Sequence, residues 1–279
     1  MLNALTIDLE DWYQGLTSTG KQIDRWDMYE DRVIENSERL LDVFNQAKVK
    51  ATFFVLGYVA DQFPQLIHMI AEAGHEIGLH SYLHQRVVLL TPDQFRADVL
   101  RGREAVEKAS GMKVIGYRAP MFSINKSRMW ALEILHELGF VYDSSIFPIR
   151  NGYYGFPEAP RFPYYPLEER SFVEFPLSTV RFFGINWPAA GGFYLRLLPY
   201  TLFKLGLQRI NDEGKPAIIY LHPWDLDPDQ PYLDPTLRER FTHYYNLHTA
   251  ESKLINLLRD FHFGPLRNLL NDKALVSGR

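Results

Sequence analysis

Two histidines four residues apart, His80 and His84, are the side chains of this sequence best suited to bind a metal ion. If a helical turn follows a strand there, both imidazoles lie on one face, because residues i and i+4 are neighbours on a helix. Two neutral imidazoles begin a divalent metal site that needs one or two oxygen ligands. His75 and Glu76 imitate a metalloprotease helix, but that motif needs histidines at i and i+4. His75 and His80 are five apart, so we reject a protease site and interpret His75 as a buried structural histidine.

An acidic segment near the N-terminus offers the missing oxygen ligands. Residues 2–9 form a short apolar run that turns acidic at Asp8, Glu10 and Asp11. A buried strand that ends in carboxylates is typical of α/β proteins, which place their chemistry at the carboxyl edge of a parallel sheet. Side chains along a strand repeat with period two, so Asp8 and Glu10 are expected to point the same way. The residues alone leave a solvated acidic turn open as the alternative.

Strands and helices alternate along the chain, which predicts an α/β fold. Beyond the first strand, apolar runs predict strands at 51–56, 75–80, 114–117, 140–142, 172–177 and 216–221. Helical periodicity and capping residues predict helices at 29–46, 60–73, 91–109, 126–138, 197–211 and 249–261. Residues 149–166, rich in Gly, Pro and aromatics, are expected to form a long ordered loop over one side of a barrel.

Polar side chains stand at the ends of four of these predicted strands. They are Asp8 with Glu10, His80 with His84, Arg118, and Asp143. An enzyme barrel or a doubly wound sheet gathers such residues at one end. The order of elements therefore predicts a single site assembled from distant parts of the chain.

The composition is that of a well-packed globular protein. The chain has 279 residues, 46% of them hydrophobic, which suits one large α/β barrel or two ordinary domains. A net charge of −4 gives no reason to expect nucleic acid or an anionic membrane as a partner. Because there are no cysteines, a metal ion must be held by His, Asp or Glu. Sixteen Tyr and five Trp hint at sugar-stacking sites, although such rings also pack cores.

Nothing in the sequence indicates export or a membrane anchor. The N-terminus lacks the basic segment and apolar core of a signal peptide, and no run approaches the ~18 apolar residues of a membrane span. We therefore expect a cytoplasmic protein. The residues carry no signal for an oligomeric state.

The motifs and their order resemble the polysaccharide deacetylase family, also called carbohydrate esterase family 4 or the NodB-homology domain. They are the acidic TxD strand at 6–8, TFF at 52–54, GHEIGLHSYLH at 74–84, YRAP at 117–120, YDSS at 142–145 and LH at 221–222. The resemblance implies a distorted (β/α)7-type barrel, a single α/β domain at residues 1–225. A C-terminal helical extension, residues 226–279, is then expected to pack on the barrel.

Four further segments are similar to a bacterial subgroup found in exopolysaccharide or exosortase (PEP-CTERM)-linked gene sets. They are TIDLEDW, FPLSTVR, YLHPWDLDPDQP and FTHYYNL. The similarity implies a role in exopolysaccharide biosynthesis.

The resemblance implies that His80 and His84 are metal ligands. Many family members carry a metal-binding Asp directly after the base, but this chain has Leu9 there. Some relatives have D-x-D or D-x-E instead, so we take Glu10 as the third ligand, with Asp11 as the alternative. Two histidines and one carboxylate suit Zn first, and also accept Co, Ni or Fe.

The remaining catalytic roles also come from the resemblance. Asp8 is implied to be the general base, paired with Arg118, while Asp143 supports that arginine. His222 is implied to be the general acid. From the residues alone, Arg118 could instead form a structural ion pair, and His222 could be a capped strand end.

Three residues are expected to contact the substrate. Leu221 would line a small pocket for the acetyl methyl group, and Pro120 and Trp224 would touch the sugar.

The expected activity is hydrolysis of N-acetyl groups on an amino-sugar polysaccharide or its precursor, with release of acetate. An iron oxygenase with a two-histidine, one-carboxylate site is disfavoured, because that site usually sits on a jelly roll. Two alternatives stay open. The barrel could host another C–N hydrolase, allantoinase-like or deformylase-like, or the chain could be a metal-free carbohydrate-binding relative.

Overall fold

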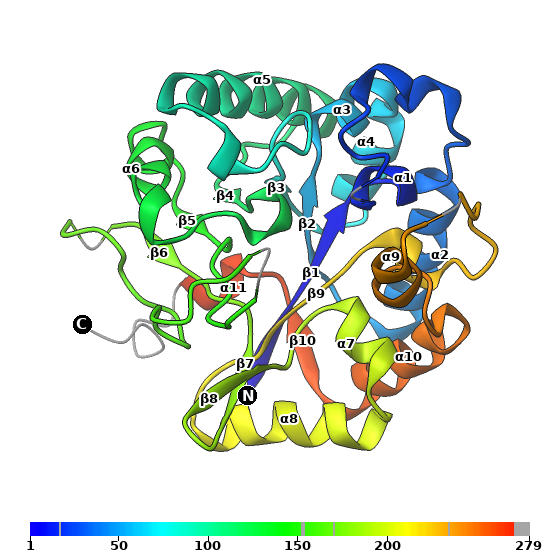
Figure 1. The fold of residues 1–279 in the computed structure, drawn as a ribbon, viewed down its shortest axis with the longest axis vertical. Helices are drawn as coiled ribbons and strands as arrows, with labels where there is room; N and C mark the ends of the chain where they lie inside the picture. Colours follow the sequence, from blue (N-terminus) through cyan, green and yellow to red (C-terminus); the bar gives the residue numbers. More distant parts are fainter. Residues whose placement is uncertain (17, 152–153, 170, 234, 271–279) are drawn as a thin grey trace.

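A curled parallel sheet forms the centre of the molecule (Figure 1). The computed structural model describes residues 1–16, 18–151, 154–169, 171–233 and 235–270. Within them the sheet has the strand order β10-β1-β2-β3-β4-β5-β6, and β9 also pairs with β1. These strands are β1 (Leu2–Leu9), β2 (Thr52–Val55), β3 (Glu76–Leu79), β4 (Gly116–Tyr117), β5 (Tyr142–Asp143), β6 (Val173–Glu174), β9 (Ile218–Leu221) and β10 (His262–Gly264). The sheet makes a half-barrel, which confirms the predicted distorted barrel and its α/β class.

Helices cover the outside of the sheet (Figure 1). They are α1 (Trp12–Gly15), α2 (Val33–Ala47), α3 (Gly57–Gln62), α4 (Pro64–Glu72), α5 (Pro92–Ser110), α6 (Trp130–Glu137), α7 (Gly192–Leu197), α8 (Tyr200–Asp212), α9 (Leu237–Thr242), α10 (Ala250–Asp260) and α11 (Arg267–Leu270). Short 3-10 helices are η1 (Ile23–Met28), η2 (Val87–Leu89), η3 (Pro120–Phe122), η4 (Lys126–Arg128), η5 (Pro223–Leu226) and η6 (Leu247–Thr249). None of the described helices is long and apolar enough to cross a membrane.

The predicted helices are largely found, with one break. Thr91 begins α5 as expected, and its hydroxyl and the Gln94 side chain cap each other's backbone N–H groups. The helix expected at 60–73 is two helices, α3 and α4, separated at Phe63. Phe63 has φ −130° and ψ 57°, because the proline that follows it disfavours the helical conformation.

Several short elements were not predicted. They include the antiparallel hairpin of β7 (Thr179–Phe182) and β8 (Ile185–Pro188), the helices α7 and α9, and strand β10. Each is too short to show a clear period in the sequence. The predicted long loop at 149–166 is ordered in its described part, where Tyr164 pairs with Glu174 beside the sheet.

Alternation along the strands decides which side chains face the interior of the barrel. Ala4 of β1 and Tyr220 of β9 belong to the inner apolar cluster, whereas Ile7 and Leu221 pack in the larger cluster with the helices. Asp8 has the same parity as Ala4, so it points toward the inner side. The carboxyl ends of these strands therefore carry polar groups toward one cavity.

The C-terminal part of the chain is tied to the rest by strand pairing and by hydrogen bonds. Strand β10 pairs in parallel with the first residues of β1. The ammonium of Lys253 in α10 donates to the carbonyl oxygens of Leu195, Arg196 and Leu198 at the end of α7. The predicted domain boundary at residue 225 stays a prediction, and residues 271–279 lie outside the described residues.

Candidate active site

Glu10, His80 and His84 meet at the carboxyl edge of the sheet. One ligand atom of each lies within 4.8 Å of the others. Nε2 of His84 is 2.7 Å from Oε2 of Glu10. Glu10 comes just after β1 and His80 just after β3, and the two strands flank β2 at the same edge of the sheet. Among the described residues these three form the cluster with metal-binding geometry.

The backbone conformation that places His84 in this cluster differs from the predicted one. We expected a helical turn, but residues 80–84 form an irregular loop in which Ser81 and His84 have left-handed φ values of 66° and 54°. The N–H of His84 donates to the Ser81 hydroxyl, and the N–H of Tyr82 donates to the carboxylate of Asp98. Because side chains satisfy these N–H groups, the segment has no need of helical hydrogen bonds.

The protonation of the cluster suits a divalent cation. Nδ1 of His80 donates to the carbonyl oxygen of Arg118 at 2.8 Å, which leaves the lone pair of Nε2 free for a metal. Burial lowers the pKa of His80 to about 4, so its imidazole is neutral near pH 7. Burial alone would raise the pKa of Glu10, but the adjacent His84 outweighs it and the pKa falls to about 2.

Glu10 also has an unsatisfied oxygen. Its buried Oε2 makes no hydrogen bond within the described part of the chain, although it lies close to His84. Nε2 of His84 satisfies this oxygen only when it carries a proton, and a cation bound between the two atoms would replace that proton. The donor set and the close approach of these two atoms both fit a divalent metal ion.

Asp11 lies apart from this cluster. Its carboxylate accepts the N–H of Trp12 at the start of α1 and the N–H groups of Arg32 and Val33. These contacts turn its oxygens toward the start of α2. The structure therefore favours Glu10 over Asp11 as the carboxylate ligand.

Asp8 forms a buried ion pair with Arg118. Nη1 of Arg118 lies 2.8 Å from Oδ1 of Asp8 and 2.6 Å from Oγ1 of Thr6. The guanidinium is fully buried and sits 4.3 Å from the centre of the Phe54 ring. Its other nitrogens donate to the carbonyl and hydroxyl oxygens of Ser144. With all these contacts the arginine fixes the orientation of the Asp8 carboxylate.

Asp143 hydrogen-bonds to Ser145 and supports Arg118 only indirectly. Its oxygens accept the N–H and the hydroxyl of Ser145. The Ser145 hydroxyl in turn accepts the N–H of Ala119 at 2.7 Å. Asp143 therefore holds the backbone that follows Arg118, whereas Ser144 meets the guanidinium itself.

Glu174 is a buried carboxyl group that the sequence analysis missed. It lies next to Asp143, and burial together with that neighbouring charge raises its pKa well above the usual range. The raised pKa of Glu174 favours its neutral form, which reduces the repulsion between the two buried carboxyl groups.

His222 is held by a carboxylate three residues further along. Oδ2 of Asp225 lies 3.0 Å from Nδ1 and 2.9 Å from the backbone nitrogen of His222. Burial lowers the pKa of His222, but Asp225, with Glu10 and Asp8, outweighs it and raises the pKa above its ordinary value. Nε2 is 3.6 Å from Oε1 of Glu10, so this nitrogen faces the cluster.

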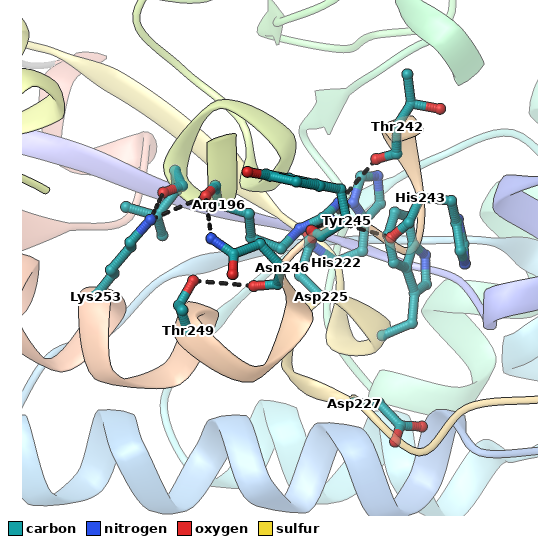
Figure 2. Close-up of polar contacts among 12 residues, drawn as sticks. Arg196, His222, Asp225, Asp227, Thr242, His243, Tyr245, Asn246, Thr249 and Lys253 are labelled. Atoms are coloured by element: carbon teal, nitrogen blue, oxygen red, sulfur yellow. Dashed lines mark hydrogen bonds and ion pairs between the residues drawn. The ribbon is translucent and has the colours of Figure 1, made fainter. Parts of the chain in front are cut away.

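A buried arginine links His222 to the C-terminal segment (Figure 2). Nε of Arg196 lies 2.9 Å from Oδ1 of Asp225, and both side chains are fully buried. The remaining guanidinium nitrogens donate to the carbonyl oxygens of Thr242, His243 and Tyr245. The spacing of His222 and Asp225 within HPWD was visible in the sequence, but nothing there pointed to Arg196.

Trp224 lies in the middle of a stack of three rings. Its ring centre is 4.3 Å from that of His222 and 4.0 Å from that of His243. Both faces of the indole are covered, so Trp224 offers a substrate an edge rather than a stacking surface. His243, to which the sequence analysis gave no role, lines the same cavity.

The site opens into a cavity of about 410 Å³. Its wall includes Asp8, Glu10, His80, His84, His222 and Trp224, and it adds Tyr154, Tyr220, Glu239 and Phe241. The expectation for Leu221 is corrected, because strand alternation turns it into the outer core and presents Tyr220 instead. Pro120 is buried at the start of η3, and the next two residues, Met121 and Phe122, line the cavity in its place.

Two family models cover most of the chain. The family described as polysaccharide deacetylase matches residues 26–142. The chain contains a polysaccharide deacetylase domain. A domain of unknown function (DUF3473) matches residues 144–271. The candidate site extends beyond the deacetylase domain, because Asp8 and Glu10 precede it and His222 lies in the DUF3473 segment.

A curated relative resembles the deacetylase domain in sequence. The peptidoglycan-N-acetylglucosamine deacetylase of Bacillus cereus is 34% identical over 101 residues, which make up 36% of this chain and 37% of that protein. The chain thus matches just over a third of this relative's length.

Two solved structures resemble the fold over nearly the whole chain. A Mycobacterium smegmatis protein assigned to the polysaccharide deacetylases aligns with a TM-score of 0.67 and 24% identity, covering 99% of this chain and 91% of that one. A carbohydrate esterase family 4 pseudoenzyme from Bacillus anthracis aligns with a TM-score of 0.54 and 17% identity, covering 97% and 66%. At these identities the likeness is one of fold.

Proposed function

We propose that this protein hydrolyses the N-acetyl group of an amino sugar in a polysaccharide or its precursor, releasing acetate and a free amine. One observation carries the proposal. The trio Glu10, His80 and His84 shares a single cavity with a buried carboxylate, Asp8, and an imidazole, His222. The matched deacetylase domain and the name of the Bacillus cereus relative agree with this reaction.

The trio would hold a divalent metal ion through one carboxylate oxygen and two imidazole nitrogens. When bound, such an ion supplies a Lewis acid for the acetyl carbonyl and for water. Zn is our first choice, and Co, Ni or Fe would also suit these ligands.

Asp8 acts as the general base in this proposal. It shares the inner side of the barrel with Glu10 and lines the cavity. Its carboxylate, oriented by Arg118, accepts a proton from the attacking water. Nη1 of Arg118 also donates to the hydroxyl oxygen of Thr6. The Thr6 hydroxyl donates its own proton to the carbonyl oxygen of Ile219, so it does not take up the proton from water.

His222 acts as the general acid. An amine is too poor a leaving group to depart as an anion, so a proton must reach its nitrogen as the C–N bond breaks. Nδ1–H of His222 donates to the Asp225 carboxylate, so the protonated imidazole presents its second proton, on Nε2, to the cavity and gives it to the leaving amine. Arg196 and the Trp224 ring keep this imidazole in place.

Acetate release tests the proposed function directly. Purified protein, loaded with Zn or Co, is incubated with N-acetylglucosamine oligosaccharides, and acetate and free amines are both quantified. We expect the two products in equal amounts, because hydrolysis of one amide yields one of each. Acetylated xylan serves as an O-acetyl control. Acetate from xylan without any amine from the oligosaccharides would indicate an esterase and contradict N-deacetylation.

A metal-free carbohydrate-binding protein is the second candidate, and the likeness to the Bacillus anthracis pseudoenzyme favours it. Such a protein would bind the oligosaccharides and release no acetate after metal addition. The intact set of Asp8, His80, His84 and His222 argues against it.

Other C–N hydrolases would use the same trio on a different amide. The exopolysaccharide-linked subgroup and the cytoplasmic location stay predictions.

A further inference from the structure

A second cavity adjoins the candidate active site. It has a volume of about 420 Å³ and shares Gly15, Leu16, His84 and Met121 with the first cavity. These four residues form the ridge between the two spaces. A chain molecule with one unit in the first cavity can therefore continue into the second.

The wall of the second cavity is rich in hydrogen-bond donors and cations. It contains Lys21 and Arg86, and the amides of Gln14, Gln85 and Gln94. No Asp or Glu is among the described residues that line it, whereas the first cavity includes Asp8, Glu10 and Glu239. Neither Lys21 nor Arg86 forms an ion pair with a described residue. The second cavity thus presents positive charge that the protein itself does not neutralise.

Gln14 is a buried residue at the wall of the second cavity. Gln14 of α1 is only 1% exposed, and its Oε1 accepts the N–H of Asp11 at 2.8 Å. Its Nε2 is buried and has no hydrogen-bond partner among the described residues. This nitrogen has almost no solvent-accessible surface, so Lys21 and Arg86 are the charged groups that a ligand in the cavity can reach.

We infer that the second cavity binds a carboxylate-bearing sugar unit next to the N-acetylated unit, so that the substrate is an acidic polysaccharide. The inference rests on the proposed function for the first cavity. A planar carboxylate offers two acceptor oxygens, which the guanidinium of Arg86 can meet with two N–H groups. The ammonium of Lys21 supplies further donors. Leu89, Leu90 and Ile23 add apolar wall for the sugar ring.

Two hexasaccharides separate an acidic from a neutral substrate. One alternates N-acetylglucosamine with glucuronic acid, and the other contains N-acetylglucosamine alone. Wild-type protein is expected to show the higher kcat/KM for acetate release from the acidic chain. Arg86→Gln is expected to raise KM for the acidic chain about tenfold, with kcat and the neutral chain little affected. Lys21→Gln should also raise KM for the acidic chain. The preference of wild-type protein for the acidic over the neutral chain should shrink at high salt.

Calorimetric binding of both chains provides a readout apart from turnover. Arg209→Gln, an exposed change on α8 outside both cavities, is the matched control and should leave affinity for the acidic chain unchanged. Equal affinity of wild type and Arg86→Gln for the acidic chain would overturn the inference, whatever the acetate assay shows. Acetate release without preference between the chains would overturn it while the proposed function stands. A preference in binding without acetate from either chain would support the acidic subsite and contradict the proposed function.

Discussion

Replacing Asp8 with asparagine is expected to lower kcat for acetate release by about 10²–10⁴-fold, the usual contribution of a general base. An amide of the same shape can still accept the hydrogen bond from Arg118, but it cannot take a proton from water. Asp8 lies outside the trio with metal-binding geometry, so metal content should stay unchanged. The measurement is steady-state acetate release together with elemental analysis of the same protein sample.

Glu10→Gln is the matched comparison for this variant. Asp8 and Glu10 are two residues apart and line the same cavity, yet the geometry gives them different roles. Glu10→Gln should lose both metal and activity, whereas Asp8→Asn should lose activity alone. An Asp8→Asn protein that retains kcat within about threefold would contradict the assignment of the base, since a base contributes far more.

Replacing Arg118 with leucine is expected to lower the free energy of unfolding by about 3–5 kcal/mol, as is usual when one partner of a buried ion pair is removed. Asp8 is 2% exposed, so its charge would remain in the barrel without its cation. The oxygens of Thr6 and Ser144 would lose their donors as well. Urea denaturation followed by circular dichroism gives the free energy of unfolding.

A double variant separates the buried charge from the lost packing. Asp8→Asn combined with Arg118→Leu should regain part of the stability, because no unpaired charge is left inside. Arg209→Leu on the exposed side of α8 should change the free energy of unfolding by less than about 0.5 kcal/mol. If Arg118→Leu had the same free energy of unfolding as Arg209→Leu, the ion pair would contribute nothing to stability. That result would contradict the description of Asp8 as a buried charge that depends on Arg118.

The sequence was sufficient where local patterns decide the structure. The alternation along β1 correctly indicated that Asp8 and Glu10 share a direction, and both line the cavity. Thr91 and Pro92 marked the start of α5, because capping depends on residues close in sequence. The alternation of apolar runs and periodic segments predicted the α/β class, and the resemblance to the deacetylase family predicted the distorted barrel.

The sequence was insufficient where tertiary contacts decide. The left-handed loop at Ser81 and His84 depends on side-chain hydrogen bonds that no period reveals. Arg196 is buried beside Asp225, 29 residues away in the chain, and only the fold brings them together. The choice between Glu10 and Asp11 required the start of α2, whose N–H groups engage Asp11.

Metal content by elemental analysis tests the central claim most directly. Wild-type protein, the double variant His80→Ala/His84→Ala and the control His68→Ala are each loaded with Zn, dialysed and analysed. His68 lies on an exposed part of α4, with 59% of its side chain accessible, so its loss should not affect the site. We predict about one metal ion per chain in wild type and His68→Ala, and none in the double variant, because two of three ligands are gone. A wild-type protein that retains no metal, or a double variant that retains as much as wild type, would contradict the account.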